Sequence, residues 1–304
     1  MGEIFHSANR PLARSIIKIG VRLFLGRSKS HFQDWLPGLK IISSEERQQA
    51  LIRYRSVDIV ETLAFADVDL NKPDCVFIVG SGPSINQCAI EKIPAGSALL
   101  LNGAISLIGS KIQEPLAIVV EDERFVWRHF TLLKEKVHQN VPCLLSISVI
   151  RAICEIDSAW LRDRKVVLIR NILAPYGQKR RSEMAVQSGL LFRSENSAVS
   201  IDPDKGIFPA GSVAATAMQF ALASGATRIG LFGIDISNAN LPRFYENETS
   251  SAYTGILSAE HRILAFFAAA KQYAGRKSIE LDCFSPVSAL LKIGYRYDER
   301  FESD

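Results

Sequence analysis

A short apolar run that leads directly into a glycine-rich turn is the feature that most constrains this chain. Cys75-Val-Phe-Ile-Val79 is apolar throughout, which indicates a β-strand buried on both faces. Gly80-Ser81-Gly82-Pro83-Ser84 follows at once. Glycine lets a ligand or another backbone come close, and free amides at a strand-to-helix turn can bind an anion. The turn lacks the third glycine of the dinucleotide fingerprint, so both a nucleotide loop and a tight turn without a ligand stay open.

Similar apolar segments recur along the chain, with helical patterns between several of them. The clearest expected helices cover residues 213–224 and 259–273. Apolar strands that alternate with helices indicate a mainly parallel sheet. We therefore predict an α/β fold, a Rossmann-like mostly parallel sheet with helices on both faces. The expected strands are 75–79, 98–101, 116–120, 142–147, 165–169, 228–232 and 278–282.

Composition excludes several classes of protein. The 304 residues are 47% hydrophobic and 22% charged, as in a globular chain of one large domain with appendages or two small domains. The net charge of +4 is too small to indicate nucleic-acid binding. The five cysteines show no C-x-x-C spacing, so we expect buried, reduced thiols of a cytosolic protein. The sequence contains no run of 18 apolar residues, so we predict no membrane-spanning helix.

Residues 8–26 carry the strongest local charge bias, in an amphipathic helical pattern. Two interpretations stay open, an ordinary surface helix docked on the core and a helix that binds anionic lipids of the cytoplasmic leaflet. The second predicts a cytoplasmic protein that associates peripherally with the inner membrane. The basic stripe consists of Arg10, Arg14, Lys18 and Arg22, and the opposite apolar face of Leu12, Ile16, Ile19, Leu23 and Phe24.

Two further segments complete the expected organisation. Residues 43–66 are predicted to be helical, with Ser43 or Ser44 as the cap. Residues 175–207 read as a long polar loop, which favours a lid or a partner-binding insertion. We expect an N-terminal basic helical region over residues 1–70 and a nucleotide-binding domain over residues 71–304.

Four segments in this order resemble the bacterial CMP-sugar glycosyltransferase superfamily. They are Ile-Val-Gly-Ser-Gly-Pro-Ser at 78–84, Leu-Leu-Asn-Gly at 100–103, Gly-Ser-Val-Ala-x-x-Ala at 211–217, and Gly-Ala-Thr-Arg-Ile-Gly-Leu-Phe-Gly-Ile-Asp at 225–235. The superfamily includes sialyltransferases, motility-accessory flagellin glycosyltransferases and, as neighbours, lipopolysaccharide-core Kdo transferases. An archaeal-type hydroxymethylpterin diphosphokinase group shares the central domain. The resemblance spans roughly residues 74–290 and does not specify the sugar.

The resemblance implies an inverting, metal-independent transfer of a CMP-activated 2-ulosonic acid, such as Kdo or sialic acid, onto a glycan or glycolipid acceptor. It implies no cofactor and no nucleic acid, and it leaves a homo-oligomer open. Asp235 would precede a helical lid around residues 236–258. The residues implied to bind the donor are Gly80, Ser81, Gly82, Pro83, Ser84, Asn102, Gly103, Gly211, Ser212 and Asp235.

The lid departs from the sialyltransferase pattern. Those enzymes carry Tyr-x-Gly-His with a histidine base, and this chain reads Tyr253-Thr-Gly-Ile256. His261 is the best remaining candidate for the base, because histidine is a residue type suited to removal of a proton from a sugar hydroxyl, and a helix-surface histidine with no catalytic part is an equal alternative. Glu260 is an alternative base or simply an acid in the first turn of a helix. Tyr245 and Tyr253 would stabilise the departing phosphate.

Two acidic motifs bear on the alternatives. Asp67-Val-Asp69 precedes the first expected strand of the sheet, which favours an incidental match. Glu121-Asp122-Glu123 follows a strand, where magnesium could bind, and solvated acids are an equal expectation. A magnesium site would favour a pterin diphosphokinase-like enzyme. A non-catalytic sugar-nucleotide-binding module is the third alternative.

Overall fold

The computed structural model describes residues 10–43, 49–68, 74–236, 244 and 256–303. The chain forms two compact units that interleave in the sequence. The first unit consists of residues 1–68, 120–187 and 204–206, and the second of residues 69–119, 188–203 and 207–304. No helix in the described part of the chain is long and apolar enough to cross a membrane.

The second unit is built on parallel strands, as the apolar runs predict. They are hydrogen-bonded in the order β13-β12-β11-β4-β5-β6, and their printed pairs are all parallel. The chain turns outward from β4 to β5 on one side and from β11 to β12 on the other. The sheet therefore reverses its winding between β4 and β11, which is the place where ligands bind in open parallel sheets. The strands are β4 (Cys75–Val79), β5 (Ala98–Leu101), β6 (Ala117–Val120), β11 (Arg228–Phe232), β12 (Glu280–Cys283) and β13 (Arg296–Tyr297).

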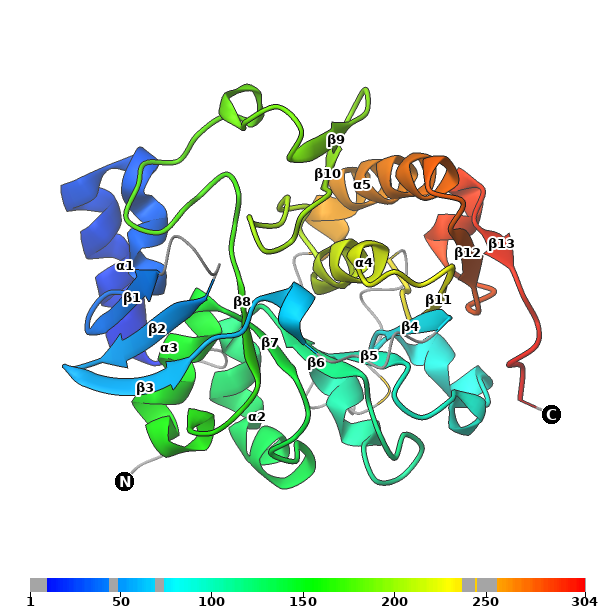
Figure 1. The fold of residues 1–304 in the computed structure, drawn as a ribbon, viewed down its shortest axis with the longest axis horizontal. Helices are drawn as coiled ribbons and strands as arrows, with labels where there is room; N and C mark the ends of the chain where they lie inside the picture. The colour runs from blue at the N-terminus through cyan, green and yellow to red at the C-terminus, as the bar shows by residue number, and fades with distance from the viewer. Residues whose placement is uncertain (1–9, 44–48, 69–73, 237–243, 245–255, 304) are drawn as a thin grey trace. The chain divides into compact units, whose positions relative to one another are not determined.

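Two long helices cover one face of these strands (Figure 1). α4 (Val213–Ala223) packs on β4 and β5, and α5 (Ile256–Arg276) packs on β12 and on α4. The prediction of an α/β fold with a mostly parallel sheet is confirmed. The expected strands at 75–79, 98–101 and 228–232 match the observed bounds, because each is largely apolar and is followed directly by a glycine or a polar residue.

The first unit contains two strands that pair in parallel, β7 (Cys143–Ser146) and β8 (Val166–Ile169). Its helices are α1 (Leu12–Leu25), α2 (Glu123–Lys136) and α3 (Ile147–Asp157). Short 3₁₀ helices connect many elements of both units. They are η1 (Arg27–Asp34), η2 (Phe65–Asp67), η3 (Pro83–Gln87), η4 (Ile90–Lys92), η5 (Asn102–Leu107), η6 (Ser158–Leu161), η7 (Glu183–Ala185) and η8 (Ala289–Ile293).

The predicted helix over residues 43–66 is wrong. β1 (Leu39–Ser43), β2 (Ala50–Tyr54) and β3 (Val57–Glu61) form an antiparallel sheet there. β2 buries every second residue, which is the period of a strand on a half-buried sheet. Arg55 and Ser56 make the turn between β2 and β3 with φ of 47° and 69°, a conformation usually left to glycine or asparagine. The β2–β3 hairpin was not predicted because Arg55 and Ser56 are not the residue types that usually indicate such a turn.

The polar segment 175–207 is less irregular than its sequence indicates. β9 (Leu191–Arg193) and β10 (Ala198–Ser200) form a two-stranded antiparallel hairpin within it. All five cysteines carry free thiols, and all but Cys75 are buried. Burial raises the pKa of the Cys143 thiol to about 12, which keeps it protonated.

Candidate functional site

The resembling segments meet at one edge of the second unit. The turn 80–84 follows β4, Asn102 follows β5, and Asp235 follows β11, so all three lie at carboxyl ends of parallel strands. α4 runs back to the start of β11, which places its first residues at the same edge. The turn 80–84 and Asp235 flank the point where the winding of the sheet reverses.

Asp235 binds the glycine-rich turn directly. Its carboxylate is buried and accepts hydrogen bonds from the Ser84 amide at 2.8 Å and from the Ser84 hydroxyl at 2.7 Å. The Ser285 hydroxyl, just beyond β12, donates to the same carboxylate at 2.8 Å. One buried acid therefore joins the ends of β4, β11 and β12. The sequence offered only a weak signal for Ser285, a serine shortly after the expected strand.

The two glycines of the turn are needed for this packing. A Cβ at Gly80 would lie 2.4 Å from the Gly233 carbonyl oxygen, and a Cβ at Gly82 would lie 2.5 Å from an Asp235 carboxylate oxygen. The Gly80 amide donates to the Phe232 carbonyl at 2.8 Å, and the Gly82 amide donates to the Gly233 carbonyl at 2.9 Å. The expectation that the turn offers a row of free amides is therefore wrong. Among the described residues, Ser81 is the position of the turn whose amide has no partner.

The Cys88 thiol supports the same corner. It donates to the Ser84 carbonyl at 3.5 Å and to the Phe284 carbonyl at 3.3 Å. Burial raises the pKa of the Cys88 thiol to about 11, and the nearby Asp235 carboxylate acts in the same direction. The thiol therefore stays neutral and serves as a weak donor, so Cys88 has a structural role beside the turn.

Among the predicted site residues that the structure describes, Asn102 has the features most expected of a residue that contacts a ligand. Its φ of +46° places it in the left-handed region, which asparagine tolerates better than most residues. Its Oδ1 atom is buried and has no hydrogen-bond partner in the described structure. A buried acceptor without a donor is costly, and such groups often mark a place for a ligand. Gly103 follows it, is buried and begins η5 with it.

The start of α4 is built as the sequence predicts for a helix cap. The Ser212 hydroxyl accepts a hydrogen bond from the Ala215 amide at 3.2 Å, and Gly211 has a φ of +94°. A Cβ at Gly211 would lie 2.4 Å from a guanidinium nitrogen of Arg262, whose Nε donates to the Ala210 carbonyl at 3.2 Å. Val213 and Ala214 open the helix with amides that have no partner among the described residues.

The side chain of Gln219 holds the segment before α4 in place, and this role was not predicted. The side chain is fully buried in α4. Its Oε1 accepts from the Ser200 amide at 2.9 Å and the Phe208 amide at 2.8 Å. Its Nε2 donates to the Phe208 carbonyl at 3.0 Å and the Ala215 carbonyl at 3.1 Å. This role could not be read from the sequence, since the partners Ser200 and Phe208 precede Gln219 by 19 and 11 residues and lie outside the recognised motifs.

The predicted catalytic residues are only partly described. Glu260 and His261 lie near the start of α5, and His261 is exposed. Because α5 runs back toward the start of β12, this end of the helix lies at the same edge as Gly211 and Asp235. Tyr245, Tyr253 and almost all of the predicted lid over residues 236–258 lie outside the described residues.

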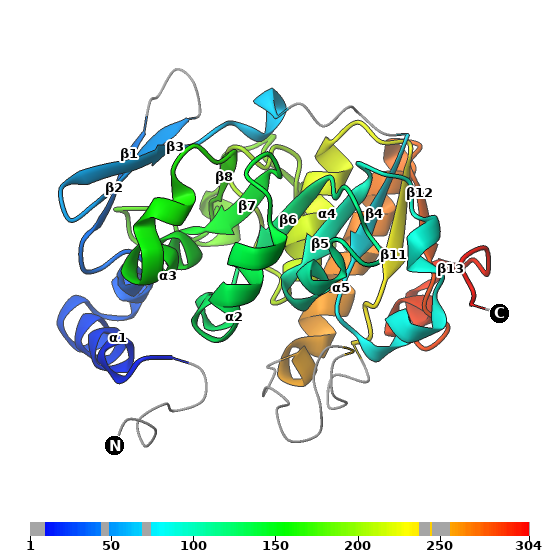
Figure 2. The same cartoon turned by 90° about the horizontal axis from the view of Figure 1, so that it is seen from below.

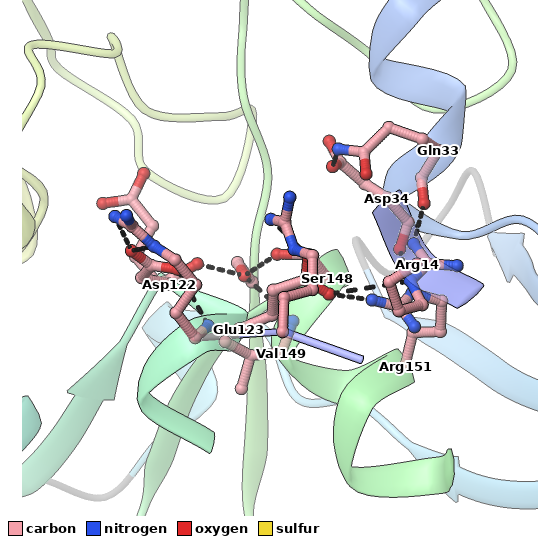
Figure 3. Close-up of polar contacts among 12 residues, drawn as sticks. Arg14, Gln33, Asp34, Asp122, Glu123, Ser148, Val149 and Arg151 are labelled. Atoms are coloured by element: carbon pink, nitrogen blue, oxygen red, sulfur yellow. Dashed lines mark hydrogen bonds and ion pairs between the residues drawn. The ribbon is translucent and has the colours of Figure 1, made fainter. Parts of the chain in front are cut away.

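The acidic motif at residues 121–123 belongs to the first unit. Asp122 caps α2 by accepting from the Arg124 amide at 2.9 Å, and it also binds the Arg124 side chain. Glu123 is buried against Arg14 and Arg151 (Figure 3), and it also pairs with Arg10 at 2.5 Å. A metal at these two acids would have to displace arginines that already balance their charge. The described residues hold no group of three or more His, Cys, Asp and Glu side chains fit for a metal ion.

Comparison with known proteins gives weak structural likenesses. No family model matches the chain, and no curated protein matches it significantly. Two structures of the sialyltransferase CstII from Campylobacter jejuni are similar. The complex with the substrate analogue CMP-3FNeuAc has 12% identity and a TM-score of 0.39, over 75% of this chain and 88% of that one. The complex with cytidine-5'-monophosphate has 14% identity and a TM-score of 0.34, over 76% and 92%. Likeness at this level does not carry an argument about function.

Proposed function

We propose that this chain is an inverting, metal-independent glycosyltransferase that uses a CMP-activated 2-ulosonic acid, such as Kdo or sialic acid. The acceptor would be a bacterial cell-surface glycan such as the lipopolysaccharide core. The proposal rests on one observation at Asn102. Its buried Oδ1 has no donor among the described residues, and it lies at the carboxyl end of β5, the neighbour of β4 at the point where the winding of the parallel sheet reverses. A cytosine amino group or a ribose hydroxyl could supply that donor.

The binding mode differs from the one that the sequence favours. Because the amides of Gly80, Gly82 and Ser84 are already paired, they cannot bind the nucleotide phosphate. Among the described residues, backbone amides without a partner at this edge include the Ser81 amide and the first amides of α4. Amides at a helix start favour an anion, since the helix dipole adds to their hydrogen bonds. We assign the phosphate to the start of α4 and the nucleoside to the neighbourhood of Asn102.

The proposed chemistry needs two functions at this edge. As the glycosidic bond to the phosphate breaks, negative charge grows on the leaving CMP, and donors at the start of α4, with Tyr245 and Tyr253, would stabilise it. The acceptor hydroxyl must lose its proton to a base as it attacks. His261 is the proposed base because its side chain is exposed near the start of α5 and histidine is the side chain that most often serves as a general base.

A thermal-shift panel of CMP, CDP, UMP, ADP and ATP, each with and without magnesium, tests the proposal. We expect CMP to raise the melting temperature without magnesium, because a ligand that binds only the folded state stabilises it. Asn102→Gly should abolish the CMP shift while it keeps the left-handed backbone. Ser278→Gly is the matched control. Ser278 also has a positive φ, of +55°, but it lies before the amino end of β12, away from the carboxyl ends of the strands.

Three results would contradict the proposal. They are stabilisation by ATP with magnesium instead of CMP, as expected of a diphosphokinase, no stabilisation by any nucleotide, and equal CMP shifts in Asn102→Gly and the unmodified protein. A protein that binds CMP and neither hydrolyses nor transfers a CMP-sugar would be a binding module. In an active enzyme, His261→Ala should lower transfer by about 10²-fold or more and leave the CMP shift unchanged.

A further inference from the structure

Helix α1 turns its apolar face to solvent. Leu12, Ile16 and Ile19 are 58%, 62% and 60% exposed, and Leu23 and Phe24 are 75% and 88% exposed. Arg14 on the opposite side is only 2% exposed. A helix that docks on a core through the hydrophobic effect places these side chains the other way round. The expected basic stripe is therefore divided, since Arg14 faces inward and Lys18 and Arg22 are exposed.

Polar contacts hold the helix in this orientation (Figure 3). Arg14 donates to the Gln33 carbonyl at 2.5 Å and to the Leu36 carbonyl at 2.6 Å. Its guanidinium also lies 3.9 Å from the carboxylate of Glu123, which begins α2. Figure 2 shows α1 beside η1. These buried charges fix which side of α1 faces inward and leave the leucines and isoleucines available to a partner.

Cations border the apolar face. Residues 10–33 contain no acid, and Lys18, Arg22 and Arg27 are exposed. A loop distant in sequence adds to this charge. The Arg180 amide donates to the Ser28 carbonyl at 2.8 Å, which brings the exposed Lys179 and Arg180 to the end of α1. The surface thus combines large apolar side chains with a cationic border.

We infer that this surface, Leu12, Ile16, Ile19, Leu23 and Phe24 with the border of Lys18, Arg22, Arg27, Lys179 and Arg180, docks on an anionic lipid bilayer. An interfacial helix buries such an apolar face at the level of the headgroups, and anionic lipids attract the flanking cations. A second copy of the chain fits less well, because a two-fold contact through α1 would bring the two cationic borders together. The inference is independent of the proposed transferase activity.

Co-sedimentation with vesicles tests the inference. The full chain should bind vesicles of phosphatidylcholine mixed with phosphatidylglycerol, bind pure phosphatidylcholine weakly, and lose binding as salt rises. Leu23→Glu should weaken binding to the mixed vesicles about tenfold or more, because a carboxylate would enter the interface. Arg22→Gln should weaken binding to the mixed vesicles only. Val57→Glu is the matched control, since Val57 is 51% exposed on the β2–β3 hairpin of the same unit.

All three substitutions are at exposed positions, so each variant should fold, and unfolding curves check this. A loss of vesicle binding can then be told apart from a loss of folding. Equal binding of Leu23→Glu and the unmodified protein would overturn the inference. Equal loss of binding in Val57→Glu would also overturn it, because the effect would then be one of net charge. A dimer that Leu23→Glu converts to a monomer, with no vesicle binding in either protein, would assign the face to a second copy instead.

Discussion

The carboxylate of Asp235 accepts two hydrogen bonds from Ser84, one from its amide at 2.8 Å and one from its hydroxyl at 2.7 Å. These residues lie 151 positions apart in the sequence. The pair fixes the glycine-rich turn after β4 to the end of β11. Ligand binding at this edge therefore would not have to order the turn, which removes one common cost of association.

Asp235→Ala should lower the free energy of unfolding by about 3 kcal/mol or more, because it leaves the Ser84 amide and two buried hydroxyls without an acceptor. Urea denaturation measures the loss. Glu114→Gln, at an exposed acid of the same unit, is the control and should change stability by less than about 0.5 kcal/mol. A loss no larger in Asp235→Ala than in the control would contradict the assigned contacts.

Gly82→Ala should destabilise the protein by about 1–3 kcal/mol through overpacking. The cause is steric, since the backbone of Gly82, with φ of −64° and ψ of 152°, suits alanine. Gly275→Ala is the matched control, because Gly275 lies in α5 with nothing within 4 Å of its Cβ position. That change should stabilise by about 0.5–1 kcal/mol through helix propensity. Thermal and urea unfolding of both variants should show opposite signs.

Glu123→Gln should cost about 3–5 kcal/mol, because it removes the fully buried carboxylate that pairs with the guanidinium of Arg151 and leaves the more exposed Glu155 as its remaining ion-pair partner among the described residues. Glu135→Gln on the exposed side of the same helix should be nearly neutral. Urea midpoints of the two variants make the comparison. A small effect at Glu123 would mean that Glu155 alone balances the charge of Arg14 and Arg151.

Asp34→Asn should change how stability depends on pH. Burial and the Glu123 carboxylate raise the pKa of Asp34 from 3.8 to about 6. Between these values the folded protein binds more protons than the unfolded chain, so this group makes stability fall as pH rises from about 4 to about 6. The size is about 2–3 kcal/mol. The asparagine variant should lack this fall, so the difference between the two urea midpoints should widen up to about pH 6 and then stay constant.

The parts of the fold that local sequence determines could be predicted. The strands around Phe77, Leu100 and Leu231 are apolar on both faces, and Ser212 caps α4 as its position before the helical pattern indicates. The burial of Arg14 could not be predicted, because its counter-charge Glu123 lies more than 100 residues away in the sequence. The paired amides of the glycine-rich turn depend in the same way on residues 232–235.

The position of Asn102 at the end of an apolar strand was predicted from the strand pattern, and its Oδ1 atom without a partner among the described residues was not. A sequence pattern locates an amide side chain at the end of a strand, and only the neighbouring backbone decides whether that amide is satisfied. The same limit applies to Ser285 and Gln219, whose hydrogen-bond partners lie on other elements.

Gln219 makes four hydrogen bonds from a single side chain, two as donor and two as acceptor. Glutamate has no donors to offer, methionine has neither kind of group, and asparagine is one methylene shorter. A saturation-mutagenesis scan of α4 would therefore find position 219 among its least tolerant sites, although the residue lies in the core. Such intolerance would reflect the placement of the loop before the helix, and an alignment alone would be liable to mistake it for contact with substrate.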